Sequence, residues 1–220
     1  MTVMKKIGIL GTGIVGKTIG NKLIELGYKV MMGSRTKSNE TAREWVALNG
    51  ANASEGSFSD ATLFGDIIFN CTKGDSSIKA LQMARPENFK GRIVIDLANP
   101  LDFSQGMPPS LLPQFSNTTS LGEMIHKLLP EAHVVKTLNM VNCEVMVDAK
   151  KSGGDPTMFI CGNDEEAKKE VTSLLNQFGW IDIIDLGDIS AARGTEMMLP
   201  IWLRTWQATG NGHFGFKIVR

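Results

Sequence analysis

Three glycines near the amino terminus, in the pattern Gly11-x-Gly13-x-x-Gly16, have the spacing of a turn that holds a pyrophosphate. The pattern follows an apolar run, KIGIL, and leads into a segment with helical periodicity. In such a turn the first glycine permits a tight bend, the second admits the pyrophosphate, and the third lets helix and strand pack closely. The start of the helix adds oriented N–H groups and partial positive charge. The spacing predicts a dinucleotide site, although a purely structural strand-to-helix turn would use the same glycines.

A second stretch, MMGSRTKSN at residues 31–39, lies at the expected end of the next strand, about 20 residues beyond the glycine turn. A site that prefers NAD usually places Asp or Glu here, on the ribose 2′-hydroxyl. This stretch has no acid; instead Ser34 can donate to a 2′-phosphate, Arg35 can offer a fork of donors, and Lys37 adds a mobile charge. Because a carboxylate would repel the phosphate, the stretch favours NADP(H) as cofactor. The alternative is a solvated basic turn before a helix.

Small and amide-bearing residues follow the later expected strands, at the edge of the sheet where open α/β proteins bind ligands. The candidates there are Cys71, Thr72, Lys73, Ala98, Asn99 and Asn139. Of these, Thr72 and Asn139 are the favoured side chains for the nicotinamide ribose and carboxamide. Asp96 is expected to cap or orient a loop rather than to act as a base.

Hydride transfer from a nicotinamide needs stacking, a short distance and exclusion of water, and no acid–base residue is obligatory. The sequence offers no convincing triad, carboxylate pair or metal-ligand spacing, so we predict no catalytic side chain and no metal ligand. His126 and His133 are expected to be structural. His213 lies in the tail GNGHFGF, which could close over a ring.

The segments that must position these residues alternate between β-branched runs and amphipathic runs, as βαβ units do. We predict strands at 6–10, 29–33, 66–71, 92–96, 132–137, 156–161 and 181–185. We predict helices at 14–26, 40–49, 76–85, 120–129, 164–178 and 190–209. The expected fold class is α/β, a Rossmann-type, doubly wound, mostly parallel sheet with a small C-terminal α/β portion. Residues 1–150 would form the NADP-binding domain, with 151–220 packed on it as one compact unit.

Two segments fit this scheme less well. Residues 99–120 are rich in proline and small polar residues, and a loop of this length is usually functional or disordered. The last helix carries Trp202 and Trp206, and Pro200 within it should produce a kink. Because an apolar terminal helix on a small domain often needs a second surface, we predict a homodimer through this helix.

Composition limits the partners and the compartment. The 220 residues include 23 basic and 23 acidic side chains, which gives no electrostatic reason to expect nucleic acid or an anionic membrane as a partner. The three cysteines are an odd number without metal-ligand spacing, as expected for free thiols in a reducing compartment. No apolar run reaches about 18 residues and no signal peptide is evident, so we predict a cytoplasmic protein.

Four stretches resemble the NADP-dependent deazaflavin (coenzyme F420) oxidoreductases and their bacterial relatives of unassigned substrate: GTGIVGKTIGNKLIELGYKVMMGSR, HVVKTLNMVNCEVM, MFICGNDEEAKKEVTSLLNQFGW and MMLPIWLRTWQATGNGHFGFKIVR. The resemblance spans nearly the whole chain. It implies a homo-oligomer and a deazaflavin or flavin as possible co-substrate, with Ser34 and Arg35 on the 2′-phosphate and Asn139 at the nicotinamide. The pyrophosphate contacts that it implies are Thr12, Gly13, Ile14 and Val15. The cytoplasmic reductase domain of six-transmembrane metalloreductases is also similar.

The chain departs from this family at two places. Asn39 stands where the family has a basic residue, so Lys37 would substitute for it. Thr72 and Lys73 replace an apolar residue and a proline, which alters the floor of the acceptor pocket.

Three functions are compatible with these observations. The first is an NADP(H)-dependent oxidoreductase that acts on a deazaflavin, a flavin-like compound or another small redox acceptor. The second is a reductase of a small imine or carbonyl metabolite, for which the chain has little room for a substrate domain. The third is a non-catalytic sensor or regulatory protein that binds NADP(H).

Overall fold

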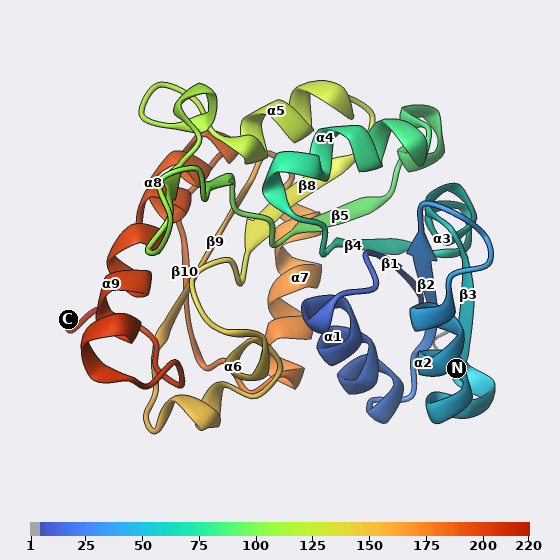
Figure 1. The fold of residues 1–220 in the computed structure, drawn as a ribbon, viewed down its shortest axis with the longest axis horizontal. Coiled ribbons are helices and arrows are strands. Elements are labelled where there is room, and N and C mark those ends of the chain that lie inside the picture. Colours follow the sequence, from blue (N-terminus) through green and yellow to red (C-terminus); the bar gives the residue numbers. More distant parts are fainter. Residues whose placement is uncertain (1–4) are drawn as a thin grey trace.

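A single sheet of eight strands forms the centre of the molecule in a computed structural model that describes residues 5–220 (Figure 1). The spatial order of the strands is β10-β9-β8-β5-β4-β1-β2-β3. Their bounds are β1 (Lys6–Leu10), β2 (Lys29–Ser34), β3 (Ala53–Ser57), β4 (Ile67–Asn70), β5 (Ile93–Asp96), β8 (His133–Thr137), β9 (Thr157–Gly162) and β10 (Asp182–Asp185). The six strands from β3 to β8 are parallel, β9 pairs with β8 in the antiparallel sense, and β10 is parallel to β9. The predicted Rossmann-type, mostly parallel α/β fold is confirmed.

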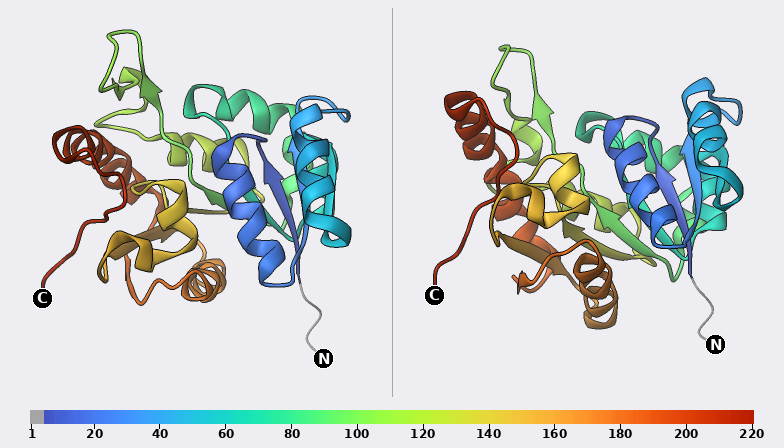
Figure 2. Two further views of the ribbon diagram at one scale, coloured as in Figure 1. Left: turned by 60° about the horizontal axis from the view of Figure 1, so that its bottom comes forward. Right: turned by 90° about the horizontal axis from the view of Figure 1, so that it is seen from below.

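Helices cover both faces of this sheet (Figure 2). Their bounds are α1 (Ile14–Glu25), α2 (Glu40–Asn49), α3 (Phe58–Phe64), α4 (Gly74–Met83), α5 (Leu121–Leu128), α6 (Cys143–Val147), α7 (Glu165–Gln177), α8 (Ala192–Met197) and α9 (Leu199–Thr209). Successive strand residues face opposite sides, so Phe69 belongs to the core cluster that includes residues of α1, α2, α6 and α7, while Ile68 belongs to the cluster that includes residues of α3, α4, α5 and α8. Because both faces are covered, the central strands are mostly apolar, with polar residues near their ends and a buried lysine, Lys136, within β8.

One strand of this sheet, β3, and two short helices, α3 and α6, were not predicted from the sequence. Strand β3 has the sequence ASEGS, whose small and polar residues carry little strand propensity, and it lies at the edge of the sheet. Helix α3 has only seven residues and is fixed by a capping box between Ser57 and Asp60. Short elements of this kind lack the periodicity that marks longer ones.

The C-terminal helix is broken rather than kinked, so the predicted continuous helix over 190–209 is wrong in this detail. Helix α8 ends at Met197 and α9 begins at Leu199, which places Pro200 in the first turn of α9. A proline is tolerated there because its missing N–H would have no helical partner. Both helices lie at the end of the sheet opposite β3 (Figure 1).

The segment after α9 packs back onto the chain. The backbone N–H of Thr157 donates to the carbonyl of Phe216 at 2.8 Å, and the ring of Phe214 stacks on Trp202 with centroids 5.2 Å apart. Trp202 is therefore buried by its own chain, whereas Trp206 is exposed.

The proline-rich segment 99–120 contains a short antiparallel pair, β6 (Leu101–Asp102) with β7 (Ser110–Leu111). Over residues 5–220, no helix combines the length and the apolar character needed to span a bilayer.

Candidate functional site

The glycine turn lies at the carboxyl end of β1, where it contacts the end of β4. Gly11 has φ +123°, and a Cβ there would lie 2.7 Å from the carbonyl oxygen of Cys71. A Cβ on Gly16 would lie 2.2 Å from the carbonyl oxygen of Gly11, so this glycine permits close packing of α1 on the turn. Gly13 has open space at its Cβ position and precedes α1 without a side-chain cap. The three glycines therefore have the three roles of a pyrophosphate-binding turn, and the first N–H groups of α1 face a space that a ligand can enter.

A pocket of about 540 Å³ opens in front of this turn. The end of β2, the start of α3, the end of β4 and one face of α4 complete its walls. The lining residues are Gly11, Thr12, Gly13, Ser34, Arg35, Asn39, Phe58, Cys71, Thr72, Lys73, Ser76, Lys79, Ala80 and Met83. The pocket thus brings together eight of the fifteen residues predicted from the sequence.

The charges of this pocket are all positive. Arg35, Lys73 and Lys79 line it, and no acidic side chain does so among the described residues. None of the three forms an ion pair with any residue from 5 to 220. A pocket with three uncompensated cations and a glycine turn fits a ligand that carries several phosphates.

The end of β2 is held in a fixed turn. Ser34 is buried, and its hydroxyl donates to the carbonyl of Thr36. Arg35 is exposed toward the pocket, whereas Lys37 lies outside the lining, 3.4 Å from the carboxylate of Asp60. Hydrogen bonds from Ser57 lower the pKa of Asp60, and the charge of Lys37 lowers it further, so this carboxylate is ionised beside the lysine.

At the end of β4 the side chains are already hydrogen-bonded to one another. The hydroxyl of Thr72 donates to Oδ1 of Asn70 at 2.6 Å and lies 2.7 Å from the hydroxyl of Ser77. Burial, and then the charge of Asp96, raise the pKa of the Cys71 thiol, which favours the neutral thiol in this half-buried position.

Asn99 and Asn139, from the ends of β5 and β8, pair with each other outside the pocket lining. Nδ2 of Asn99 donates to the carbonyl of Asn139 at 2.8 Å, and Nδ2 of Asn139 donates to Oδ1 of Asn99 at 2.9 Å and to the carbonyl of Thr195 at 3.0 Å. Leu138, which precedes Asn139, has φ +61°, a strained conformation for a branched side chain. These hydrogen bonds therefore fix the segments that follow β5 and β8 to each other and to Thr195 of α8.

Below these asparagines lies a cluster of buried charges that was not predicted from the sequence. The ammonium of Lys136 lies 2.7 Å from Asp96 and 2.9 Å from Glu196, and each of the three side chains is at most 1% exposed. The same ammonium donates to the carbonyl of Ala98. Burial disfavours the charged ammonium, but the two carboxylates outweigh this effect and raise the pKa of Lys136. The signal in the sequence was the lysine in the middle of the apolar strand HVVKT.

Glu196 connects this cluster to a helix start. Its carboxylate accepts the backbone N–H groups of Leu121 and Gly122 at 2.9 and 3.0 Å, in the first turn of α5. Burial raises the pKa of Glu196 although Lys136 lowers it. The expectation that Asp96 orients a loop agrees with its contacts, since Asp96 also accepts the N–H of Ala98 at 3.2 Å.

The remaining predicted contacts lie along α1. Ile14 is largely exposed in the first turn, Val15 is half-buried, and Gly16 is buried against the turn. Their side chains do not line the pocket, so any contact with a pyrophosphate would use their backbone N–H groups.

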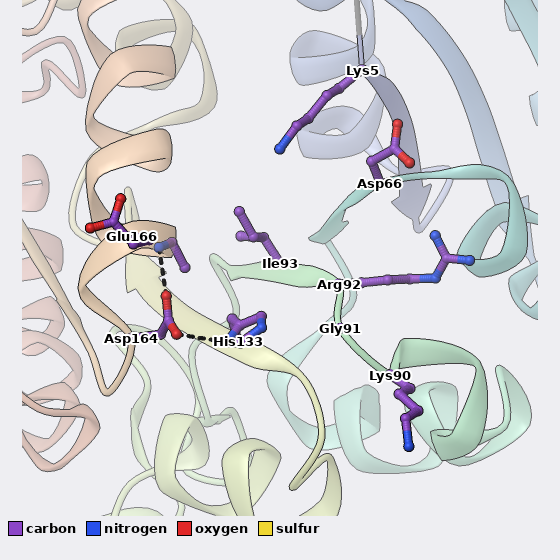
Figure 3. A pocket seen from close by; sticks show the side chains of 10 residues that line it. Lys5, Asp66, Lys90, Gly91, Arg92, Ile93, His133, Asp164 and Glu166 are labelled. Atoms are coloured by element: carbon purple, nitrogen blue, oxygen red, sulfur yellow. Dashed lines mark hydrogen bonds and ion pairs between the residues drawn. The ribbon is translucent and has the colours of Figure 1, made fainter.

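A second pocket of similar size, about 550 Å³, lies at the opposite, amino-terminal ends of the strands (Figure 3). Its polar groups contact other protein groups: Lys5 pairs with Glu170, Lys90 pairs with Glu131, and Nδ1 of His133 lies 3.1 Å from the carboxylate of Asp164. The guanidinium of Arg92 donates to backbone carbonyls. Asp66 accepts the backbone N–H of Lys6 at 2.9 Å. Among the described residues, every lysine and arginine of this pocket is therefore already bound to a protein group.

Comparison with known proteins agrees with the site. The model of the family described as "NADP oxidoreductase coenzyme F420-dependent" matches residues 6–100. The F420-dependent NADP reductase of Methanocaldococcus jannaschii is 30% identical over 204 residues, which are 89% of this chain and 90% of that protein. The metalloreductase STEAP3 of Rattus norvegicus is 26% identical over 201 residues, which are 90% of this chain but 38% of that protein.

Solved structures show the same relationship. A candidate F420-dependent NADP reductase from Arthrobacter sp. FB24 is 47% identical, with a TM-score of 0.92 over 98% of this chain and 100% of that one. A reductive aminase from Aspergillus terreus, solved with NADPH, has 16% identity and a TM-score of 0.66 over 94% of this chain and 64% of that one, and is similar in fold alone. The chain therefore belongs to the coenzyme F420-dependent NADP oxidoreductase family, as its sequence motifs predicted.

Proposed function

We propose that this protein, an NADP-dependent oxidoreductase by family, transfers hydride between the nicotinamide of NADP(H) and a deazaflavin or flavin-like acceptor. The observation that carries the proposal is the pocket in which a pyrophosphate-type glycine turn meets three cations without an acidic partner. Arg35 at the end of β2 would bind the 2′-phosphate. Ser34 would join it once its hydroxyl turns away from the carbonyl of Thr36, and the N–H groups of α1 would bind the pyrophosphate. The deazaflavin is taken from the name of the Methanocaldococcus relative.

The nicotinamide would lie beyond this pocket, toward the ends of β5 and β8. Asn139 donates through Nδ2 to two acceptors, and its Oδ1 accepts no hydrogen bond from residues 5–220. That oxygen can accept a hydrogen bond from the amide of a nicotinamide, with Asn99 and Thr195 holding the side chain in place. The cofactor supplies the hydride, and these residues bind it and orient its ring, so no side chain needs to exchange a proton.

The test is anaerobic stopped-flow absorbance of the protein with NADPH and a panel of acceptors: a deazaflavin, flavins, quinones, ferric chelates, and small imines and carbonyl compounds. Rapid NADPH oxidation by the deazaflavin or a flavin supports the proposal. NADPH binding without oxidation by any acceptor would contradict it and favour the sensor. Oxidation by a small imine or carbonyl alone would favour the metabolite reductase.

We also propose that residues 151–220 pack on the NADP-binding portion as one compact unit, and that the cytoplasmic protein is a homodimer through α9. Ile201 and Trp206 are 54% and 44% exposed on this helix, which is a large apolar area to leave in water. Light scattering after gel filtration tests the dimer: Ile201→Glu should convert a dimer into a monomer, and a monomeric wild type would refute it.

A further inference from the structure

One face of α4 forms a wall of the nucleotide pocket. Ser76, Lys79, Ala80 and Met83 line the pocket, and their spacing of three, four and seven residues places them on one side of the helix. The adjoining side, with Leu81, is buried against the core. Packing therefore fixes which way the helix faces, and Lys79 is the charged residue that it presents to the pocket.

Lys79 has no acidic partner to satisfy it. It forms no ion pair with any of the residues 5–220, and the pocket that it lines also contains Arg35 and Lys73. Three like charges around one pocket repel each other, which disfavours the empty pocket and favours the binding of an anion between them. By contrast, the lysines of the second pocket are each paired with a glutamate.

Besides Arg35, the turn after β2 carries two polar residues, Lys37 and Asn39, that have other roles. Lys37 is largely exposed, lies outside the pocket lining and pairs with Asp60. Asn39 carries no charge, and its Oδ1 accepts the N–H of Ala42 at 3.0 Å as the cap of α2. Among the described residues, the β2 side therefore offers the pocket no cation besides Arg35.

We propose that Lys79 supplies the second cation of the 2′-phosphate site, together with Arg35, which lines the same pocket. Lys73 has a different role, because it follows Thr72, whose backbone N lies 3.5 Å from the Cβ position of Gly11, and is thus next to the glycine turn. Lys79 discriminates NADP(H) from NAD(H), whereas Lys73 attracts the pyrophosphate that both cofactors carry. This inference rests on the proposed NADP(H) function and adds a specificity residue to it.

The experiment compares three matched variants, Lys79→Gln, Lys73→Gln and Lys37→Gln, by fluorescence titration with NADPH and NADH and by calorimetry with 2′,5′-ADP and AMP. These readouts need no hydride acceptor. We expect Lys79→Gln to weaken the binding of NADPH and of 2′,5′-ADP about tenfold. The affinities for NADH and AMP should stay within about twofold of the wild-type values. Lys73→Gln should weaken NADPH and NADH equally, and Lys37→Gln should weaken neither. Lys79→Arg should restore most of the affinity for 2′,5′-ADP.

Each other outcome overturns the inference. Equal loss for NADPH and NADH in Lys79→Gln, or no loss for either, removes Lys79 from the 2′-phosphate site. A loss specific to NADPH in Lys37→Gln assigns the role to Lys37. If the wild type binds 2′,5′-ADP no better than AMP, the NADP(H) assignment itself fails, which is a separate result from a failure of Lys79. Thermal unfolding of each variant confirms that the fold is intact, as expected for exposed side chains.

Discussion

Two groups of charges lie at the same edge of the sheet and differ in almost every other respect. Arg35, Lys73 and Lys79, beside β2 and β4, are exposed, of one sign and without ion pairs among residues 5–220. Asp96, Lys136 and Glu196, beside β5 and β8, are buried and in contact with one another. Charges that are already paired hold the structure together, whereas charges without partners are available to a ligand. The presence or absence of ion pairs therefore distinguishes the charges beside β2 and β4, which are available to a ligand, from those beside β5 and β8, which stabilise the fold.

The largest effect is expected in the buried group. Lys136→Met keeps the length of the side chain but leaves two buried carboxylates without their cation. We expect the free energy of unfolding to fall by about 3–5 kcal/mol, the range for breaking a buried ion pair. Urea unfolding followed by circular dichroism measures this.

A combined variant separates charge from packing. Lys136→Met together with Asp96→Asn and Glu196→Gln removes all three charges, so it should be more stable than Lys136→Met alone. If the free energy of unfolding of Lys136→Met lies within about 1 kcal/mol of the wild-type value, the ion pairs of Lys136 do not stabilise the strand ends.

The next largest effect belongs to the exposed group. Arg35→Ala should weaken NADPH binding by about 1.5–3 kcal/mol, the range for a charge-assisted hydrogen bond, while NADH binding changes little. Stability should be nearly unaffected, because Arg35 is exposed and unpaired. Parallel NADPH and NADH titrations test this, and an equal loss for both cofactors would remove Arg35 from the 2′-phosphate.

The two groups of charges were not equally predictable from the sequence. The difference depends on how far apart along the chain the residues of each group lie. The glycine turn and Arg35 lie within one βαβ unit, where a fixed spacing relates each residue to the next, so they were identified from the sequence. Lys136 and Glu196 are brought together by the packing of α8 on a strand 60 residues earlier, and no local pattern encodes that pairing. Lys79 was missed for a related reason, since its role depends on which face of α4 is turned to the pocket.

The sheet itself was predicted wherever its strands are continuously apolar. Strand β3 was missed because an edge strand needs no apolar run, and its ASEGS sequence has none. The break before α9 shows a similar limit: Pro200 indicated a disturbance correctly, but only the structure distinguishes a kink from a new helix start.

The ion pair between Arg193 and Glu123 is intermediate between the two groups in its exposure to solvent. Its removal should give the smallest change in the free energy of unfolding. Arg193 on α8 donates to both carboxylate oxygens of Glu123 on α5, and the two side chains are 39% and 19% exposed. The hydrogen bond from Arg193 lowers the pKa of Glu123, with a further contribution from Ser120. Because partial exposure screens the pair, Arg193→Gln should cost about 0.5–1 kcal/mol near neutral pH.

The dependence of this cost on pH has a defined sign. A carboxyl group whose pKa is lowered in the folded state stabilises the fold above its ordinary pKa, and this contribution disappears as the pH falls through the lowered value. The difference in unfolding free energy between wild type and Arg193→Gln should therefore be full at about pH 7 and should disappear once the pH has fallen below the lowered pKa of Glu123. Urea unfolding of both proteins across this range measures it. If the difference in unfolding free energy persists at low pH, Arg193 stabilises α8 by packing rather than by charge. The Arg193–Glu123 pair would then not be comparable with the exposed cations or the buried cluster.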